Sequence, residues 1–377
     1  MKQNPLMALN SFGQSVWLDF LSRDALEQGK IKQLIDQDGL SGLTSNPSIF
    51  EKAIVSSQDY DDQIRAMALA DKNIEEMYEA LTVQDIQNAA DLFRPAYDQL
   101  DGRDGFVSLE VSPRLAHDTA GTIAEARRLW KAVNRPNLMI KVPATKAGLP
   151  AIRELTADGM NINITLLFGL PRYREVAEAY IAGLEMLAAK GERLNHVASV
   201  ASFFLSRIDV LCDGMLEKLQ KEDGPIAATA TQIHGQVALA SAKVAYQIYK
   251  EIFGTERFKR LTLQGARTQR LLWASTGTKN PEYSDVKYVE ALIGQDTINT
   301  MPPETMDAYR DHGQPAQRLE EEVPAAYNAL ELLSVAGINL DGITQQLEDE
   351  GVTKFIKAFD KLMIGLRDKR TASLQHA

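Results

Sequence analysis

Short hydrophobic runs alternate along the chain with longer segments in which hydrophobic residues recur every three or four positions. The first pattern predicts buried β-strands and the second predicts amphipathic helices. Eight runs of the strand type occur, at residues 15–20, 42–46, 105–111, 137–142, 160–167, 196–202, 270–275 and 296–301. Strands and helices that alternate in this way predict a parallel sheet covered by helices.

The number of strands indicates how the sheet is arranged. Eight parallel strands with intervening helices most simply close on themselves, so we predict an α/β fold of the (β/α)8 TIM barrel class. The alternative is an open, doubly wound sheet, but no Gly-x-Gly-x-x-Gly turn follows any predicted strand.

Some segments are longer than a barrel connection requires. Residues of about 48–100, including a helix at 74–97, and of about 203–265 predict helical insertions, and about 316–370 predicts a helical C-terminal extension with helices at 319–336 and 340–370. No low-complexity linker separates these parts. We therefore predict a single domain over residues 1–377.

Lys141 is unusual because it lies in the hydrophobic run of residues 137–143, which reads as a buried strand. Lysine is rarely buried without a partner, and loss of water lowers a lysine pKa from about 10.4 toward values at which the free amine is a nucleophile. Schiff-base chemistry requires such an amine. From this strand alone, a lysine whose stem packs while its ammonium group reaches water is the more ordinary explanation.

Two strands carry polar residues on one face and aliphatic residues on the other. The fifth strand alternates in this way through Asn161, Asn163 and Thr165, and the third does so through Ser108, Glu110 and Ser112. In a barrel the polar face points inward, where a carboxylate beside a lysine indicates chemistry. The alternative is a structural buried ion pair, which contributes little net stability.

Further polar residues lie where predicted strands end. These are Asp19, Asn46, Ser202 and, five residues beyond the last of them, Arg207. Taken singly, an aspartate or asparagine at such a position is more often a helix cap or turn residue. Taken together they indicate a site, because barrel enzymes build their sites at the C-terminal ends of the strands. The loop after strand seven adds Ser275 and Lys279, which with Arg207 form a candidate phosphate site.

Composition narrows the function classes. The chain has 41 Lys and Arg against 51 Asp and Glu, a net charge of −10, which argues against nucleic acid or an anionic membrane as the main partner. The single cysteine, Cys212, excludes an intramolecular disulfide and fits a reducing, cytoplasmic setting, as does the lack of an apolar segment after Met1–Pro5. The five histidines, including His376, show no metal-ligand spacing, so we predict no metal site.

Five segments resemble signatures of the transaldolase family, in the order in which that family carries them. They are residues 43–48 (LTSNPS), 109–115 (LEVSPRL), 140–145 (IKVPAT), 161–168 (NINITLLF) and 202–207 (SFFLSR). The likeness runs from about residue 13 to strand eight. The length of the chain and the sequence SNPSIF at residues 45–50 resemble the longer bacterial subtype. In that family the Schiff-base lysine lies on the fourth strand, which is where Lys141 falls.

The resemblance implies a reaction. It implies transfer of a dihydroxyacetone unit from sedoheptulose 7-phosphate to glyceraldehyde 3-phosphate, giving erythrose 4-phosphate and fructose 6-phosphate in the pentose phosphate pathway, without a cofactor. Sugar phosphates are the implied partners. The resemblance implies that Lys141 forms the Schiff base, that Glu110 transfers protons through a water held by Thr165, and that Asp19 abstracts the hydroxyl proton. It also implies that Asn46 and Asn163 bind the hydroxyls of the dihydroxyacetone unit. Ser202 and Phe204 would line the substrate site.

The likeness has one departure and leaves two rivals. Family members often carry arginine two residues after the serine that matches Ser275, where this chain has Gly277, and we predict that Lys279 replaces it. One rival is a fructose 6-phosphate aldolase, which releases free dihydroxyacetone. Glu110 and Phe204 favour transaldolase, because that aldolase tends to carry glutamine and tyrosine there. The other rival is a barrel that binds sugar phosphates without catalysis.

Overall fold

Eight parallel strands form a closed barrel in the computed structural model, which describes residues 4–375. The strands are β1 (Gln14–Asp19), β2 (Leu40–Thr44), β3 (Phe106–Glu110), β4 (Leu138–Pro143), β5 (Ile162–Leu167), β6 (Ser199–Phe204), β7 (Gln269–Ala274) and β8 (Thr297–Met301). Each pairs with its neighbours in the chain, and β8 returns to β1. The predicted TIM barrel is confirmed. Met1 and His376, considered above, lie outside the described residues.

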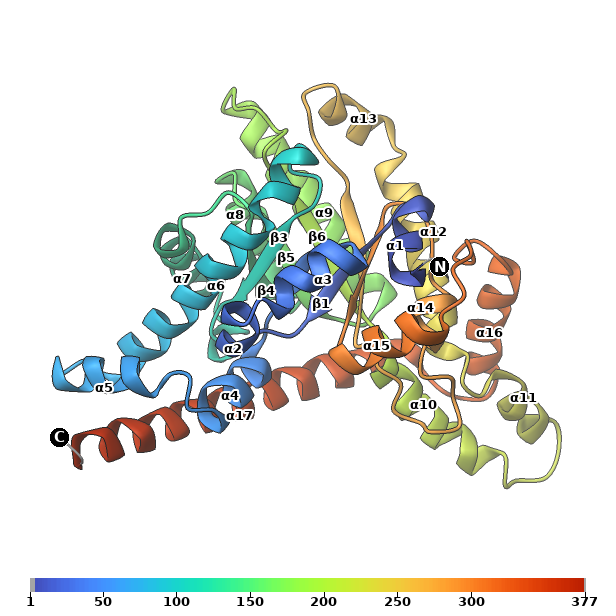
Figure 1. Cartoon of the computed structure of the whole chain (residues 1–377). Helices are drawn as coiled ribbons and strands as arrows, with labels where there is room; N and C mark the ends of the chain where they lie inside the picture. Colours follow the sequence, from blue (N-terminus) through green and yellow to red (C-terminus); the bar gives the residue numbers. More distant parts are fainter. Residues whose placement is uncertain (1–3, 376–377) are drawn as a thin grey trace.

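Helices surround the barrel and extend from it (Figure 1). In order they are α1 (Pro5–Leu9), η1 (Asn10–Phe12), α2 (Arg23–Glu27), α3 (Lys30–Asp38), α4 (Pro47–Ser56), α5 (Asp61–Leu69), α6 (Ile74–Gln99), η2 (Pro113–Leu115), α7 (Thr119–Val133), α8 (Gly148–Ala157), α9 (Leu170–Ala189), α10 (Ser206–Leu219), α11 (Pro225–Ile233), α12 (Val237–Phe253), α13 (Glu256–Thr262), α14 (Lys287–Glu290), α15 (Pro303–His312), α16 (Val323–Val335) and α17 (Leu340–Gln375). None of these described helices is long and apolar enough to cross a membrane.

The C-terminal helix α17 lies at the C-terminal ends of the barrel strands. It packs on α4, η2, α10 and the end of β5, and Figure 1 shows it running along the lower edge of the molecule past α4. A buried ion pair between Arg172 of α9 and Glu348, at 3.2 Å, fixes its first half, and an ion pair between Lys361 and Glu51 of α4, at 2.7 Å, fixes its second half. Helix α17 therefore forms part of the wall at the C-terminal end of the barrel.

One strand departs from simple alternation. The register of β5 against β6 shifts between Ile164 and Leu167, and Leu166 adopts a positive φ of 56°, which leucine rarely does. The Leu166 side chain then reaches α17, where a Cβ at Gly351 would lie 2.9 Å from it. The bulge thus joins the end of β5 to the C-terminal helix.

Candidate active site

Lys141 and Glu110 face each other inside the barrel. They are register partners on β4 and β3, and the Lys141 Nζ lies 3.4 Å from Glu110 Oε2. The same Nζ donates a hydrogen bond to the Ser45 backbone carbonyl at 3.0 Å. Since Ser45 follows β2, and β3 separates β2 from β4, this bond crosses the barrel interior. Both charged side chains are therefore buried within the barrel.

Burial dominates the protonation of Glu110. It raises the pKa of that carboxyl from 4.5 to about 7, and the negative charge of Asp19 acts in the same direction, while the positive charge of Lys141 opposes the rise. Neither carboxylate oxygen has a hydrogen-bond partner among residues 4–375. A carboxyl group with a pKa near neutral pH can both take up and release a proton at that pH, as an acid–base catalyst must.

Asp19 ends β1 on the same side of the barrel. The Thr44 hydroxyl donates to its Oδ1 at 2.7 Å and contacts the Thr300 hydroxyl at 2.8 Å, which joins β1, β2 and β8. Burial raises the pKa of the Asp19 carboxyl, and the negative charge of Glu304 on α15 adds to the rise. The positive charges of Lys141 and Arg207 and the hydrogen bond from Thr44 lower that pKa. The positive charges of Lys141 and Arg207 therefore both favour the ionised form of the Asp19 carboxyl.

The predicted inward face of β5 carries a hydrogen-bonded asparagine. The Asn163 side-chain amide donates to Ser108 Oγ at 3.0 Å, and its carbonyl oxygen accepts from Ser202 Oγ at 2.7 Å. Because β4 lies between β3 and β5, this network also spans the interior. Thr165 Oγ1 is buried without a hydrogen-bond partner in the described part of the chain. These groups form a polar lining beside Lys141.

Asn46, a predicted substrate-binding residue, also caps a helix. Its side-chain oxygen accepts hydrogen bonds from the backbone N–H groups of Ser48 and Ile49, so it caps the N-terminus of α4. The cap occupies the oxygen but leaves the amide nitrogen as a donor. The ordinary cap explanation and a substrate contact are thus compatible.

The three candidate phosphate-binding residues differ in exposure to solvent: Arg207 and Ser275 are half-buried, and Lys279 is exposed. The Arg207 guanidinium lies over the Phe204 ring at 5.6 Å, its Nη1 is buried without a hydrogen-bond partner within residues 4–375, and burial lowers its pKa. Ser275, at a positive φ of 55°, contacts Ser206 through their hydroxyls at 2.8 Å. Lys279 is exposed, and its Nζ would lie 3.8 Å from a Cβ at position 277.

Several residues of the site were not predicted from the sequence. Ser45 supplies the backbone acceptor for Lys141, Thr44 bonds to Asp19, and Glu304 adds charge. Thr44 ends β2 and Ser45 follows it, and both lie inside one of the family-like segments, so their position was a usable signal. No group of three or more His, Cys, Asp or Glu side chains that could hold a metal ion occurs in residues 4–375.

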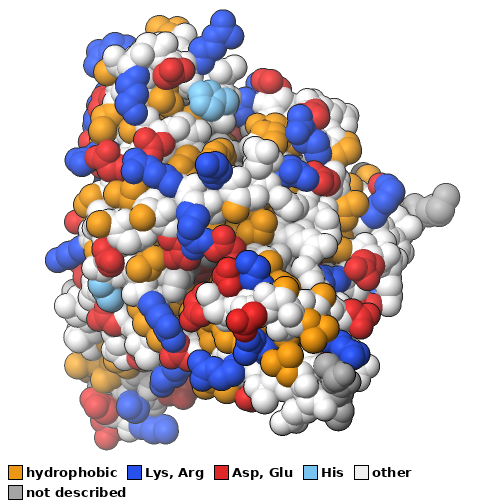
Figure 2. Space-filling model, turned by 90° about the vertical axis from the view of Figure 1, so that its left-hand side faces the viewer, with side chains coloured by type: hydrophobic (Ala, Val, Ile, Leu, Met, Phe, Trp, Pro, Cys, Tyr) orange, Lys and Arg blue, Asp and Glu red, His pale blue; other side chains and the backbone are white. Residues whose placement is uncertain are grey.

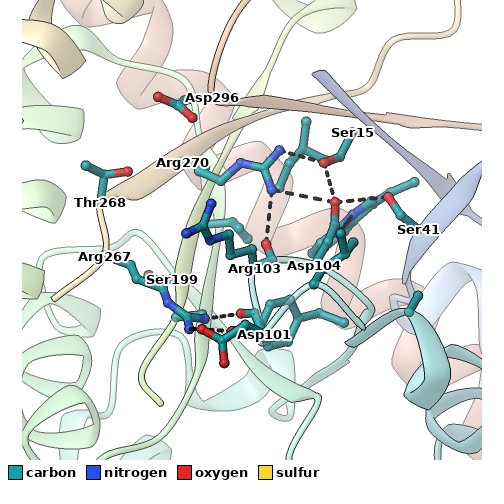
Figure 3. Close-up of a pocket in the computed structure, with 18 of the residues that line it drawn as sticks. Ser15, Ser41, Asp101, Arg103, Asp104, Ser199, Arg267, Thr268, Arg270 and Asp296 are labelled. Atoms are coloured by element: carbon teal, nitrogen blue, oxygen red, sulfur yellow. Dashed lines mark hydrogen bonds and ion pairs between the residues drawn. The ribbon is translucent and has the colours of Figure 1, made fainter. Parts of the chain in front are cut away.

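A separate cavity of about 1070 Å³ lies at the opposite, N-terminal ends of the strands. Figure 3 shows Arg270 bonded to Ser15 and paired with Asp104 at 3.7 Å, and Asp104 also accepts from Ser15 and Ser41. The indole of Trp17 donates to the same carboxylate at 2.7 Å. These groups satisfy one another at the N-terminal end of the barrel, where none of the predicted catalytic residues lies.

Comparison with known proteins identifies the family. The family model described as "Transaldolase/Fructose-6-phosphate aldolase" matches residues 16–366. A transaldolase from Trichodesmium erythraeum is 48% identical over 98% of both chains, and "Transaldolase 2" from Nostoc punctiforme is also 48% identical over 98% of both. A transaldolase from Thiobacillus denitrificans is 46% identical over 94% of this chain and 97% of its own. The chain therefore belongs to the transaldolase/fructose-6-phosphate aldolase family.

Proposed function

We propose that this protein is a transaldolase that moves a dihydroxyacetone unit from sedoheptulose 7-phosphate to glyceraldehyde 3-phosphate through a Schiff base on Lys141. The observation that carries the proposal is the buried pair of Lys141 and Glu110, 3.4 Å apart at the C-terminal ends of adjacent strands. Relatives of nearly the same length that are named transaldolase support it. The products are erythrose 4-phosphate and fructose 6-phosphate.

Formation of the imine requires an acid. The Lys141 amine attacks the ketose carbonyl, and the oxygen then leaves carbon two as water with a proton from Glu110. A carboxyl with a pKa of about 7 holds that proton at neutral pH. Thr165, whose buried hydroxyl has no hydrogen-bond partner in residues 4–375, is proposed to position the water through which the proton moves.

Cleavage requires a base at the neighbouring hydroxyl. Asp19 takes the proton from the hydroxyl on carbon four as the bond between carbons three and four breaks, and the protonated imine accepts the electron pair. The positive charge of Lys141 lowers the pKa of Asp19, against the larger effect of burial, and this proximity supports the role of Asp19 as the base. The Asn46 amide nitrogen, Asn163 and Ser202 are proposed to hold the hydroxyls of the dihydroxyacetone unit.

The phosphate group is proposed to bind Arg207. This side chain is anchored on Phe204 and keeps a buried N–H group that no residue of 4–375 accepts. Ser275 and the exposed Lys279 lie on the loop after β7, where this fold commonly holds phosphate. Lys279 would supply the charge that Gly277 lacks.

The charge distribution on the surface is consistent with a small-molecule enzyme. On the face shown in Figure 2, Lys and Arg side chains are interspersed with Asp and Glu side chains. Together with the net charge of −10, this supports small sugar phosphates as partners, with neither nucleic acid nor membrane involved. A cytoplasmic location, a reaction without cofactor and a single-domain organisation are proposed with it.

The experiment that separates transferase from lyase varies the acceptor. The enzyme is incubated with fructose 6-phosphate, with and without erythrose 4-phosphate, and glyceraldehyde 3-phosphate and free dihydroxyacetone are both measured. A transaldolase sustains turnover only with the acceptor, because the three-carbon unit stays on Lys141 until an aldehyde arrives. Continuous release of free dihydroxyacetone would identify a lyase, and no product in either case would identify a binding protein.

A further inference from the structure

Glu110 borders a second cavity as well as the barrel interior. This side cavity, of about 190 Å³, lies between α6, α7 and α17, and Glu110, Tyr78 and Glu125 are among the residues that line it. One water molecule occupies about 30 Å³ in the liquid, so the side cavity has room for several.

The side cavity leads from the barrel to solvent. The exposed fraction of the side chain increases along it from 3% for Glu110 to 17% for Glu125 and 30% for Glu79. Arg128, which pairs with both outer glutamates, is 51% exposed. The polar residues that line the side cavity thus range from the buried Glu110 to the exposed Arg128.

The polar groups along this path are suited to hold water. Glu125 is kept in place by the Ser112 backbone N–H at 3.2 Å and by Arg128 at 3.3 Å. Burial raises the pKa of Tyr78, and the negative charges of Glu125 and Glu110 raise it further. The ring of Tyr78 is fixed edge-on against Phe359 of α17 at 5.3 Å.

The two carboxylate oxygens of Glu110 are buried and accept no hydrogen bond from residues 4–375. Buried polar atoms are normally hydrogen-bonded to protein or to ordered water. Because Glu110 lines a polar cavity that is large enough for water, water is the partner that this cavity offers.

The reaction gives such a route a purpose. Formation of the imine breaks the bond between carbon two and its oxygen, which leaves as water, and hydrolysis of the imine takes up one water. At both steps a ketose phosphate would occupy the space between Lys141 and Arg207. The side cavity, which Glu110 also lines, offers the water formed there a route that the sugar does not occupy.

We propose that the side cavity is a water passage, through which the water released at Glu110 exchanges with solvent past Tyr78 and Glu125 while the sugar occupies the barrel. The proposal rests on the proposed Schiff-base function. Glu125 is a positioning residue in it, since it acts on the reaction only through water that reaches Glu110.

The passage is tested by following the oxygen of carbon two. The full-length enzyme is mixed with fructose 6-phosphate in ¹⁸O-water, exchange into the ketose is measured by mass spectrometry, and the enzyme-free rate is subtracted. Imine formation is measured separately as the rate of the adduct trapped by borohydride. If water cannot leave, the same oxygen returns to carbon two, so exchange falls while imine formation continues.

The variant Glu125→Leu removes the central polar group, and Thr82→Leu narrows the same cavity from α6. Each is expected to lower ¹⁸O exchange per imine formed by about tenfold, the size of change that about 1.4 kcal/mol on one step produces. Glu125→Gln, which keeps a polar group of similar size, is expected to stay near the wild type. Glu192→Leu, an exposed change on the loop before β6 at the opposite end of the strands, is the control.

The outcomes are distinguishable. An unchanged ratio of exchange to imine formation in both leucine variants overturns the passage, and so does an equal loss of both rates, which indicates structural damage. If Glu125→Leu does not fold, as judged by circular dichroism, Thr82→Leu decides. Absence of any trapped adduct in the wild type contradicts the Schiff-base function itself and is recognised before the variants are compared.

Discussion

The raised pKa of Glu110 predicts how stability depends on pH. In the folded state this carboxyl has a pKa of about 7 against an ordinary 4.5, because burial disfavours its charged form. Between these values the folded state binds the proton that the unfolded chain has lost. This group therefore stabilises the fold least at high pH, and its contribution is lost as pH rises from about 4.5 through 7.

The size of the effect follows from linkage. With one pKa unit equal to about 1.36 kcal/mol, a shift from 4.5 to about 7 lowers the free energy of unfolding by about 2.5 kcal/mol between pH ~5 and pH ~8. Glu110→Gln removes this titration. The free energy of unfolding of the variant, measured relative to the wild type, should therefore rise by about that amount from pH ~5 to pH ~8. Any cost of the substitution that does not depend on pH leaves this change unaffected.

The measurement is urea unfolding of the two proteins at several pH values. Their difference in unfolding free energy should change steadily in favour of Glu110→Gln as pH rises. The variant should also turn over about a hundredfold or more slowly, the usual effect of losing a positioned acid–base group. Parallel stability curves from pH ~5 to pH ~8 would refute the raised pKa, and an unfolded variant would return the pair to a purely structural role.

Three further substitutions test other parts of the account. Asp19→Ala should still give the borohydride-trapped adduct but fail to cleave the sugar; loss of the adduct would contradict a role after imine formation. Lys279→Ala should lower kcat/KM for glyceraldehyde 3-phosphate by about ten- to a hundredfold and that for glyceraldehyde much less, and equal effects would return Lys279 to solvent. Gly42→Ala should lower the free energy of unfolding by about 1–3 kcal/mol, because a Cβ at this position would overlap the Trp17 ring, and urea unfolding at wild-type stability would show that the ring gives way.

The barrel was predictable because its signal is repeated. Each strand is a hydrophobic run bounded by helical segments, and all eight predicted runs overlap the observed strands. The polar face of β5 was predictable for the same reason, since the alternation that contains Asn163 and Thr165 persists up to the bulge. The bulge itself was not predictable, because nothing in a leucine indicates the positive φ of Leu166. The Leu166 side chain lies close to Gly351 of α17, a contact between distant segments that the local sequence does not reveal.

Contacts between distant segments were also beyond the sequence. The bond from Lys141 to the Ser45 carbonyl joins residues 96 positions apart, and a backbone carbonyl has no sequence signature. The pairing of Arg270 with Asp104 at the closed end of the barrel, and the approach of Glu125 to the same cavity as Glu110, depend likewise on the packing of separate elements. The roles of the candidate site residues and the single-domain organisation stay predictions.

The most direct test of the central claim is to find the covalent bond. The enzyme is incubated with fructose 6-phosphate and borohydride, digested, and the peptides are analysed by mass spectrometry. We predict one reduced three-carbon or sugar adduct on Lys141, absent from a folded Lys141→Met variant that has also lost turnover. An adduct on a different lysine, or near-normal turnover in Lys141→Met, would contradict the account.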